Sequence, residues 1–594
     1  MENGIKKYGR LVIVILGMVV LAFLSTYPAF AGHFFAINND GDIHLARLES
    51  IYQALKAGHL PSLINFIGFS HQGIAVNAMY PWPTLMIFVI PRFLFQSPMA
   101  GLAVGFFIMN LMAIVNIYLL MRRLSSKCLI VWFGVVLYQF NSYHFQVMYT
   151  RVAIGEAFGY AFLPLIFLGL YEVWLKKRSG ILWLGLGMGL VANSHVLSLV
   201  MFTVVVIIVE LIRLFRRESS WQEVLAIIQS GVLAILLSAY SLFNIATLML
   251  SNRMVSPAPS IIPLDPNYGF TRMLSNTITE TPNGAHMGIA IGLLMLVLLV
   301  SLFSVPQSDW QSWYLSALGI LVIAQNWLPW IKMTNTSLQY LQFTMRLLTI
   351  VALLLTVGCV LFLKQVNWTS VPITILFGLF VITIGVGGLY QYHLQSNQNF
   401  NWARHKSDAK PAFNTTPEKA IWRHLTGKNY QQNVNQMTMA DYHLKKTGAK
   451  GTPKITAQEK MELSATTQLN KTSIAFDDAQ AKKFKETFVT DQKVGFKFHH
   501  FRAKQVKLPV VGYHKVNYQV FVNRKRVAYQ RVDGQLRAKL PAGTSQIVIS
   551  VANNSRHAGL LFFSLLIGGA MTVALFIKPK RLYESPGKHQ QQYN

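Results

Sequence analysis

Residues Leu11 to Phe30 read Leu-Val-Ile-Val-Ile-Leu-Gly-Met-Val-Val-Leu-Ala-Phe-Leu-Ser-Thr-Tyr-Pro-Ala-Phe, without one charged side chain. A helix needs about 20 predominantly apolar residues to cross the hydrocarbon core of a bilayer. This run has that length and follows a basic start at residues 6–10. A basic start and small residues at the end of the run also fit a cleavable signal. We favour an uncleaved first span, because the many later spans need its orientation.

The rest of the chain is built in the same way. Its 594 residues are 53% hydrophobic and 13% charged, with a mean hydropathy of +0.38. We therefore predict a mainly α-helical, polytopic membrane protein with twelve spans. The spans are expected at 11–31, 99–121, 128–141, 156–175, 180–195, 197–215, 223–250, 286–305, 310–330, 344–364, 370–391 and 558–577.

The basic residues predict the orientation of these spans, since Lys and Arg favour cytoplasmic loops. Counting from a cytoplasmic N-terminus places the N-terminus, the short basic loops at 122–127, 176–178, 213–217 and 364, and the tail at 578–581 in the cytoplasm. One apolar stretch, Tyr80–Phe95, is short and holds three prolines. We interpret it as a juxtamembrane or re-entrant helix on the outer face, and leave open whether it spans.

Four parts follow from this topology. They are a transmembrane domain at 1–391 with an outer loop at 32–98, an exterior domain at 392–557, a last span at 558–577 and a cytoplasmic tail at 578–594. The exterior domain is polar and contains stretches that alternate like β-strands at 518–523, 526–532 and 546–551. It carries 28 Lys and Arg against 10 Asp and Glu. That excess fits either solubility beside an anionic wall or binding of an acidic polymer.

The outer loop holds the densest group of chemically active side chains. Residues 39–48 read Asn-Asp-Gly-Asp-Ile-His-Leu-Ala-Arg-Leu, and Asp42 is expected to cap a helix from Ile43 to Ala57. Asp40 and Asp42 would then be plain helix caps. However, His44 and Arg47 are three residues apart and share a face of that helix. A carboxylate, an imidazole and a guanidinium in one cleft suit deprotonation of a hydroxyl beside a bound phosphate.

Three more groups stand at the expected outer ends of spans. Glu156 follows Arg151 and is either an acid at a helix N-terminus or a second acid opposite Asp40. His195 lies at a turn, where a packing role is the simpler interpretation. Gln342 and Arg346 enter the tenth span, where the arginine either snorkels or binds a lipid phosphate. Four further candidates near the loop 251–285 give a weak signal: Tyr268, Arg272, Glu280 and His286.

Several classes of site are absent from the sequence. There is no Gly-x-x-x-x-Gly-Lys-Ser/Thr motif, no Rossmann fingerprint after a strand and no His-Glu-x-x-His. These absences disfavour an ATP or nucleotide-sugar enzyme and a zinc protease. A divalent ion held by Asp40, Asp42 and Glu156 is left open. The two cysteines, Cys128 and Cys359, lie in or beside spans, so a disulfide framework is not expected.

Four blocks in order resemble the YfhO-like family of bacterial membrane proteins. They are Asp40-Gly-Asp-Ile-His44-Leu-Ala-Arg47, Tyr149-Thr-Arg151-Val-Ala-Ile-Gly155-Glu156, Ser194-His195-Val-Leu-Ser198 and Leu341-Gln342-Phe-Thr-Met-Arg346. That family is similar to GT-C glycosyltransferases, and some members carry a label related to 6-pyruvoyl-tetrahydropterin synthase, which does not imply pterin chemistry. The family's first acid aligns with Asp40. Asp42 stands where the family often has an apolar residue, and Thr344 replaces a frequent Pro.

The resemblance implies a GT-C-like bundle of about 12 transmembrane helices, a C-terminal extracytoplasmic β-rich domain and a final transmembrane helix. It also implies an inverting glycosyltransferase in a bacterial cell membrane. This enzyme would move a sugar from a polyprenyl-phosphate donor to teichoic acid or another envelope glycopolymer on the outer face. Asp40 and Glu156 would be catalytic, and the other charged and polar residues of the four blocks would bind substrate. The alternatives are a lipid or polysaccharide transporter and a non-enzymatic assembly protein.

Overall fold

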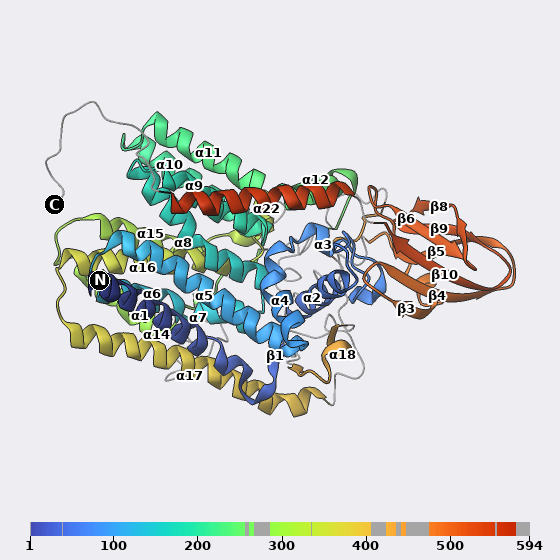
Figure 1. The fold of residues 1–594 in the computed structure, drawn as a ribbon, viewed down its shortest axis with the longest axis horizontal. Helices are drawn as coiled ribbons and strands as arrows, with labels where there is room; N and C mark the ends of the chain where they lie inside the picture. Colours follow the sequence, from blue (N-terminus) through green and yellow to red (C-terminus); the bar gives the residue numbers. More distant parts are fainter. Residues whose placement is uncertain are drawn as a thin grey trace.

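The computed structural model describes residues 2–37, 40–255, 261–266, 285–333, 336–404, 423–434, 441–446, 474–552 and 555–577. Figure 1 shows a long bundle of helices, with a β-domain that projects from one end. The last helix, α22 (Ser555–Phe576), returns from the β-domain along the bundle. Tyr268, Arg272, Glu280 and the expected tail at 578–594 lie outside the described residues.

Each of the twelve predicted regions contains a helix. They hold α1 (Glu2–Leu24) with η1 (Tyr27–His33), α5 (Pro98–Leu124), α6 (Cys128–Gln139), α8 (Ile154–Trp174), α9 (Ser179–Ala192), α10 (Val196–Phe215), α11 (Trp221–Leu237) with α12 (Ala239–Ser251), α14 (Ile289–Ser301), α15 (Asp309–Ile323), η7 (Thr344–Leu347) with α16 (Leu348–Gln365), α17 (Val371–Arg404) and α22. Short helical pieces lie between them: α2 (Gly41–Lys56), η2 (Phe69–His71), α3 (Val76–Met79), η3 (Pro83–Leu85), α4 (Met86–Phe95), α7 (Ser142–Phe145), η4 (Gln146–Thr150), η5 (Trp330–Met333) and η6 (Ser337–Leu341).

The number of complete spans is lower than twelve by length and composition. Among the described residues, six helices are long and apolar enough to cross a membrane, or up to eight if two bent pairs each count as one span. The bends are 57° between α1 and η1 and 77° between α11 and α12. Helix α6 has 12 residues, which is only about 18 Å of helix. A bundle of twelve spans is therefore not confirmed.

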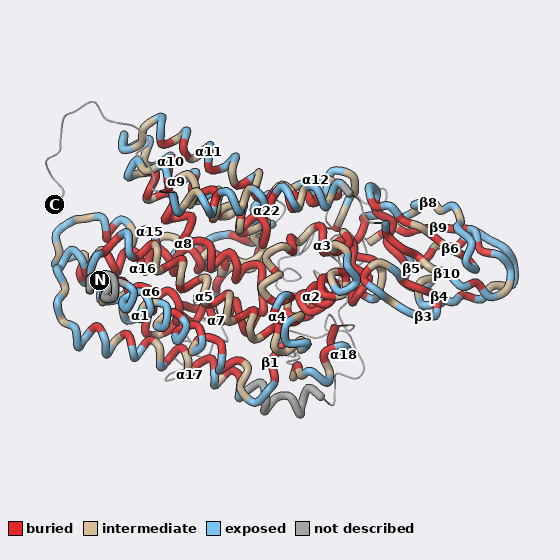
Figure 2. Tube along the Cα trace, in the orientation of Figure 1, coloured by how far each residue is buried: buried red, intermediate tan, exposed pale blue. Residues whose placement is uncertain are grey.

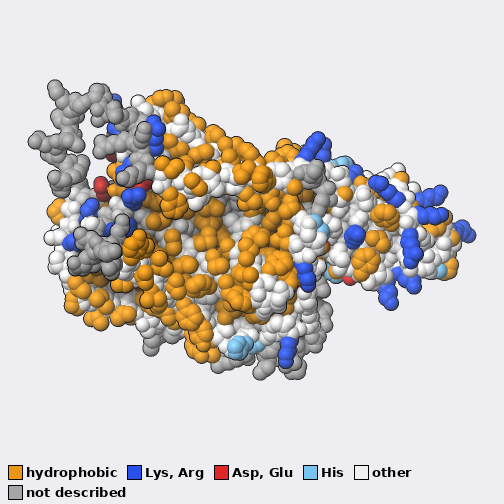
Figure 3. Space-filling model, viewed as in Figure 1, with side chains coloured by type: hydrophobic (Ala, Val, Ile, Leu, Met, Phe, Trp, Pro, Cys, Tyr) orange, Lys and Arg blue, Asp and Glu red, His pale blue; other side chains and the backbone are white. Residues whose placement is uncertain are grey.

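The surface of the bundle is that of a membrane protein. Many large apolar side chains of α1, α10, α11, α14, α17 and α22 are exposed, whereas nearly all of α8 is buried. Figure 2 shows the buried residues along the middle of the bundle, and Figure 3 shows an apolar surface over the helices with Lys and Arg gathered on the β-domain. Apolar surface of this extent matches a multi-pass membrane protein.

The predicted N-cap of the helix in the outer loop was wrong. Helix α2 begins at Gly41, so its N-cap residue is Asp40 and not Asp42, and the Asp40 side chain makes no capping hydrogen bond. Gly58 follows the helix with φ +80°, which favours glycine. The prolines of Tyr80–Phe95 leave η3 and the 10-residue α4, a length that does not span a bilayer.

The β-domain confirms the predicted strands at its end and adds others. A five-stranded sheet has the order β3-β4-β10-β6-β7 and a three-stranded sheet the order β5-β9-β8. Their bounds are β3 (Lys485–Val489), β4 (Lys493–His500), β5 (Lys504–Val511), β6 (Tyr518–Val522), β7 (Lys525–Val527), β8 (Tyr529–Val532), β9 (Gln535–Leu540) and β10 (Gly543–Val551). A helical turn, α21 (Asp478–Ala481), precedes β3. Asn523 and Asp533, at turns between strands, have φ values of 48° and 46°.

The late part of the chain also packs on the outer loop. A two-stranded sheet pairs β1 (Phe35–Ile37) with β2 (Arg423–Leu425), and α18 (Tyr430–Val434) contacts α2. Nε2 of His59 lies 3.3 Å from Oδ2 of Asp491, and His71 contacts Glu486. The outer loop is thus held between the helical bundle and the β-domain.

Candidate functional site

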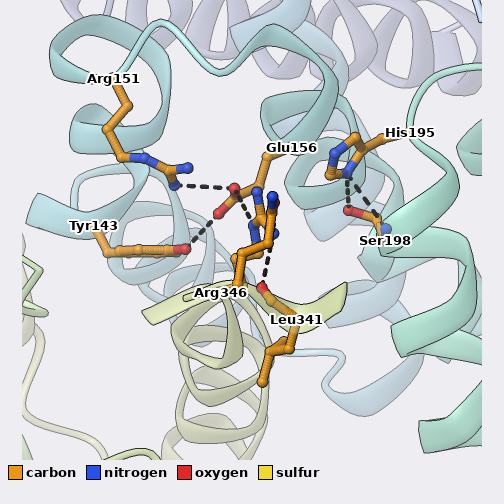
Figure 4. A network of polar contacts seen from close by, with 8 residues as sticks. Tyr143, Arg151, Glu156, His195, Ser198, Leu341 and Arg346 are labelled. Carbon is orange, nitrogen blue, oxygen red and sulfur yellow. Dashed lines mark hydrogen bonds and ion pairs between the residues drawn. The ribbon is translucent and has the colours of Figure 1, made fainter. Parts of the chain in front are cut away.

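Glu156 is the centre of a buried polar network in the described part of the bundle. Its Oε2 accepts a hydrogen bond from Nη1 of Arg151 at 2.9 Å and from Nε of Arg346 at 3.2 Å. Its Oε1 accepts a bond from the hydroxyl of Tyr143 at 2.6 Å. Figure 4 shows these three side chains around the carboxylate, and Arg346 comes from a segment 190 residues further along the chain. The structure therefore brings Arg151, Glu156 and Arg346, three of the residues singled out in the sequence, into direct contact.

These contacts define what Glu156 can do. A carboxylate that accepts hydrogen bonds from two guanidinium groups is held in its ionised form. Both of its oxygens are occupied, and its side chain is only 3% exposed. Such a group orients cations and is poorly placed to accept a proton from a substrate. The contacts favour a positioning role for Glu156 over the catalytic role expected from the sequence.

The two arginines retain hydrogen-bonding capacity. Nη1 of Arg346 donates to the backbone oxygen of Leu341 at 2.7 Å and to Oε1 of Gln342 at 2.9 Å. Nη2 of Arg346, and Nε and Nη2 of Arg151, have no hydrogen-bond acceptor among the described residues. The residues are each 7% exposed, and both guanidinium groups lie near the ring of Phe343. Two cations share one ionised acid, so the cluster has a surplus of positive charge that suits an anion.

The backbone around Arg151 is unusual. Residues 146–150 form the π-helical turn η4, and Val152 has φ 51°, a left-handed conformation that a β-branched residue rarely adopts. The backbone oxygen of Arg151 accepts a hydrogen bond from the backbone N–H of Asp40 at 3.1 Å. Strained backbone and π-turns occur often at functional sites. This bond also ties the start of α2 to the arginine cluster.

Asp40 differs from Glu156 in having an available carboxylate. It is partly exposed, and no described residue hydrogen-bonds to its side chain. Burial raises the pKa of Asp40, while the positive charges of Arg151 and Arg346 act in the opposite direction. Glu156 influences the same carboxyl, so the two acids lie at one end of the bundle. A carboxylate of raised basicity that no described residue hydrogen-bonds is suited to accept a proton.

Arg47 and His44 follow Asp40 along α2. Nη2 of Arg47 donates to the backbone oxygens of Tyr80 at 3.0 Å and Pro81 at 2.8 Å, and its Nη1 lies 3.1 Å from Nδ1 of His44. Arg47 is fully buried, and burial lowers its pKa to about 10. The pKa of His44 falls well below its usual range through burial, so the ring is neutral. Most of the Arg47 guanidinium is thus used in holding the segment at Tyr80.

Tyr80 fills the space between these groups, and burial raises its pKa to about 12. Its ring lies 4.0 Å from the Arg47 guanidinium and 5.5 Å from the His44 ring. Its hydroxyl lies against Gly155, where an added Cβ would be 2.1 Å from that oxygen. Glycine at 155 is therefore required for Tyr80 to approach the start of α8, next to Glu156.

The remaining predicted residues surround the cluster. The ring of His195 lies 5.6 Å from that of Tyr80, and its Nδ1 lies 2.8 Å from the hydroxyl oxygen of Ser198. Figure 4 shows this pair beside Arg346. Asp42 is buried in the first turn of α2. Gln342, with φ 59°, supports Arg346 directly.

Asp441 is not among the residues predicted from the sequence, and its carboxyl is influenced by the charge of Asp40. Burial raises the pKa of Asp441 to about 7, and the negative charge of Asp40 adds to the shift. The neighbouring Tyr442 is influenced by the charges of Asp441, Arg47 and Asp40. Asp441 belongs to a long polar stretch with many charges, so nothing in its local sequence distinguishes it. Only the fold brings it to the site.

A divalent ion at Asp40, Asp42 and Glu156 does not fit this geometry. Glu156 faces two guanidinium groups, whose positive charge would repel a cation in contact with its oxygens. The described residues contain no group of three or more His, Cys, Asp or Glu that could hold a metal ion. We therefore assign no step to a metal.

Comparisons with known proteins add a weak structural likeness. No protein-family profile and no curated protein matches the chain. The chain is similar to an archaeal oligosaccharyltransferase, AglB from Archaeoglobus fulgidus, in complex with an inhibitory peptide and a dolichol-phosphate. That match has a TM-score of 0.35 and 13% identity over 73% of this chain and 60% of the other. The apo form of an Archaeoglobus fulgidus oligosaccharyltransferase matches with a TM-score of 0.34 and 12% identity, over 72% and 60%.

The chain spans about three fifths of the length of these two structures. TM-scores at this level do not show that two folds are the same. The resemblance to the YfhO-like family therefore stays a prediction from the sequence. What the described residues contain is an apolar helical bundle with an anion-suited arginine cluster and an available carboxylate at one end.

Proposed function

We propose that this protein is a membrane glycosyltransferase that takes a sugar from a polyprenyl-phosphate donor. One observation carries the proposal. Two buried arginines with unused N–H groups lie beside the available carboxylate of Asp40, at one end of an apolar bundle. Phosphate recognition and proton removal are the two tasks that transfer from a lipid phosphate requires. The AglB structure, to which this chain has a weak likeness, is a complex with a dolichol-phosphate.

The arginines would hold the donor phosphate. Guanidinium groups bind phosphate oxygens through paired hydrogen bonds, and they do so most strongly where water is excluded. Glu156 would keep Arg151 and Arg346 side by side through its shared Oε2. The polyprenyl chain would lie along the exposed apolar helices. Gln342 would orient Arg346, and His195 would border the sugar.

Asp40 would act as the general base. Its carboxylate takes the proton of an acceptor hydroxyl, the hydroxyl oxygen forms a bond to the anomeric carbon, and the bond from that carbon to the phosphate oxygen breaks. The electron pair leaves with the polyprenyl phosphate, whose charge the arginines stabilise. A single direct displacement of this kind inverts the anomeric configuration. His44 and Arg47 would support the site through Tyr80, and Asp42 would shape the start of α2.

The acceptor would be an anionic cell-envelope polymer such as teichoic acid, reached on the outer face of a bacterial membrane. The β-domain supports this part of the proposal. Exposed Lys485 and Lys497 are paired across β3 and β4, and Figure 3 shows further cations over the same domain. Such a surface attracts a polyanion over a distance of about a Debye length.

The test uses the full chain purified in detergent or nanodiscs, with a panel of radiolabelled polyprenyl-phosphate sugars and a teichoic acid acceptor. We expect transfer from at least one donor. Arg346→Gln should weaken donor binding, and Asp40→Asn should abolish transfer while donor binding persists. Asp533→Asn, at a β-domain turn where Asp533 pairs with Lys507, is the matched control and should transfer at the unaltered rate.

Two results would exclude the proposal. Transport of the lipid across proteoliposomes without any sugar transfer would favour a transporter. Loss of all cellular function on deletion of the β-domain, in a protein that transfers no sugar from any donor, would favour an assembly protein.

A further inference from the structure

A cavity of about 220 Å³ lies where the outer loop, the β-domain and the start of α22 meet. Its lining comes from residues 60–63 of the outer loop, Tyr240 of α12, residues 515–517 and 551–552 of the β-domain and residues 557–558 of α22. None of these described residues belongs to the arginine cluster around Glu156, so the cavity is a second site. Its volume is below the range of about 300–1,000 Å³ that is typical of small-molecule pockets, so it suits a ligand the size of a lipid headgroup.

The inner part of this cavity holds polar atoms that no described residue uses. Ser62 is 3% exposed, and its hydroxyl has no hydrogen-bond partner in the part of the chain that the structure describes. Nδ1 of His557 is also buried and lacks a described partner. Buried polar atoms are nearly always paired, because an unpaired one loses its bonds to water without replacement. Two such atoms in one cavity point to a ligand that hydrogen-bonds to them.

The rim of the cavity is exposed and basic. Lys515 and Asn517 are exposed there, and the described lining contains no Asp or Glu. Lys515 has φ 65°, a left-handed conformation that residues with a side chain seldom adopt and that is often found at functional sites. A lysine without a neighbouring acid at the mouth of a cavity favours an anionic ligand.

Neighbouring contacts hold the loop that carries Lys515. The backbone N–H of His514 donates to Oδ1 of Asn252 at 2.8 Å, and Nδ2 of Asn252 donates to the backbone oxygen of His514 at 3.2 Å. On the other side of the lysine, Nη2 of Arg531 donates to the backbone oxygen of Val516 at 3.0 Å. The loop is therefore ordered before a ligand binds, which lowers the entropic cost of binding.

The cavity also lies where a membrane span begins. Helix α22 contains a candidate span from Arg556 to Phe576, and His557 stands in its first turn. The N-terminus of a helix carries a partial positive charge that favours an anion. Further along the same helix, the side chains of Phe562 and Leu565 are 64% and 62% exposed. An acyl chain that leaves the cavity thus has an apolar surface to follow into the bilayer.

We propose that this cavity binds the phosphate headgroup of an anionic phospholipid, which joins the β-domain to the helical bundle. The phosphate accepts hydrogen bonds from Lys515, from the imidazole of His557 and from the hydroxyl of Ser62. The glycerol part of the lipid contacts apolar lining residues such as Leu63 and Val516, which a free phosphate would leave empty. Because one ligand touches the outer loop, the β-domain and α22, its binding stabilises their contact. This inference does not depend on the proposed glycosyl transfer.

The first test compares the lipids that the full chain retains. Protein purified in detergent is incubated with equal amounts of phosphatidylglycerol and phosphatidylcholine, and native mass spectrometry counts the lipids that stay bound. We expect preferential retention of phosphatidylglycerol. Lys515→Gln should weaken it by about five-fold, the effect of one lysine beside an anionic lipid. Lys525→Gln is the matched control, because it removes an exposed lysine of β7 that does not line the cavity.

Two more variants locate the lipid. Ala558→Trp fills the cavity from α22 and should reduce retention of phosphatidylglycerol at least as much as Lys515→Gln, with circular dichroism as the check on folding. Arg346→Gln should leave retention unchanged, because the arginine cluster does not line the cavity. Phosphatidylglycerol should also raise the Tm of the unaltered protein more than phosphatidylcholine does, and Lys515→Gln should remove that difference.

Four results would overturn the proposal. Equal retention of the two lipids would remove the anion from the site. Retention that Lys515→Gln leaves unchanged would remove the lipid from this cavity, and a loss confined to Arg346→Gln would place it at the arginine cluster. Displacement of the bound lipid by inorganic phosphate at the same concentration would show that a free phosphate is the ligand. An equal Tm in both lipids would exclude the role in joining the β-domain to the bundle.

Discussion

Replacing Glu156 by Gln should strongly destabilise the protein, since it removes the anion between two buried arginines. Gln retains an oxygen for the hydroxyl of Tyr143 but presents an amide N–H₂ group to guanidinium groups that also donate. The three charged side chains are at most 9% exposed, so water does not replace the lost charge. Removing one member of a buried ion pair costs about 3–5 kcal/mol, which lowers the folding equilibrium constant by roughly two to four orders of magnitude.

A double-mutant cycle with Arg346→Gln identifies the source of this loss. Arg346 is 3.2 Å from the Glu156 carboxylate, and its removal relieves the uncompensated charge that Glu156→Gln leaves behind. The double variant should therefore be more stable than the sum of the single effects predicts, by about 0.5–3 kcal/mol. The assay is denaturant unfolding of each purified variant in one detergent, followed by intrinsic fluorescence.

Glu223→Gln is the matched control for this cycle. Glu223 is also a buried glutamate, but it pairs with Arg213, whose side chain is 19% exposed. Its replacement should cost clearly less. If Glu156→Gln changes the free energy of unfolding no more than Glu223→Gln, or if the two effects at 156 and 346 simply add, the account of Glu156 as the organiser of the arginines is refuted.

Three further changes test other parts of the site. Gly155→Ala should cost about 1–3 kcal/mol of stability, because its Cβ would lie 2.1 Å from the hydroxyl oxygen of Tyr80. The free energy of unfolding in denaturant measures this loss. Burial lowers the pKa of His44, so the unfolded state binds a proton more readily than the folded state, and stability falls as the pH drops below about 6.5. His44→Gln should reduce this pH dependence of the free energy of unfolding, measured by unfolding at a series of pH values. Replacing Lys485 and Lys497 together by Gln should weaken teichoic acid binding at low salt, with the difference vanishing near 1 M salt, where the Debye length is about 3 Å.

Each of these has a control elsewhere in the chain. Gly378→Ala should be tolerated, since its nearest neighbouring atom is 3.9 Å from the added Cβ. Exposed His499→Gln should leave the pH slope of stability unchanged. Lys364→Gln, at the end of α16, should not alter polymer binding. Equal effects of a control and its test variant would contradict the corresponding prediction.

The sequence predicted the parts of the site that depend on short spacings. His44 and Arg47 are three residues apart on a helix, and they do meet, with 3.1 Å between Nδ1 and Nη1. Arg151, Glu156 and Arg346 were expected at the ends of spans; Arg151 is close to Glu156 in sequence, whereas the contact of Arg346 with Glu156 joins residues 190 apart, which no short spacing predicts. Charges at the ends of apolar helices stand out because their cost in a membrane is high.

Other features depended on contacts that no local pattern encodes. The 77° bend between α11 and α12 occurs at Ser238, although the glycine of that predicted span is at 231 and it has no proline. Backbone carbonyl groups at residues 80 and 81 occupy the guanidinium of Arg47, which the sequence assigned to a phosphate. Asp441 stands in a polar stretch, where charged residues are common, so its place in the sequence does not indicate a functional role.

The availability of Asp40 is the central claim of this account, and a single pair of measurements tests it. Radiolabelled sugar transfer and binding of the polyprenyl-phosphate donor are compared in the unaltered protein and in Asp40→Asn. The account predicts that transfer is lost while donor binding by Arg151 and Arg346 is retained. Transfer at the unaltered rate in Asp40→Asn would contradict it.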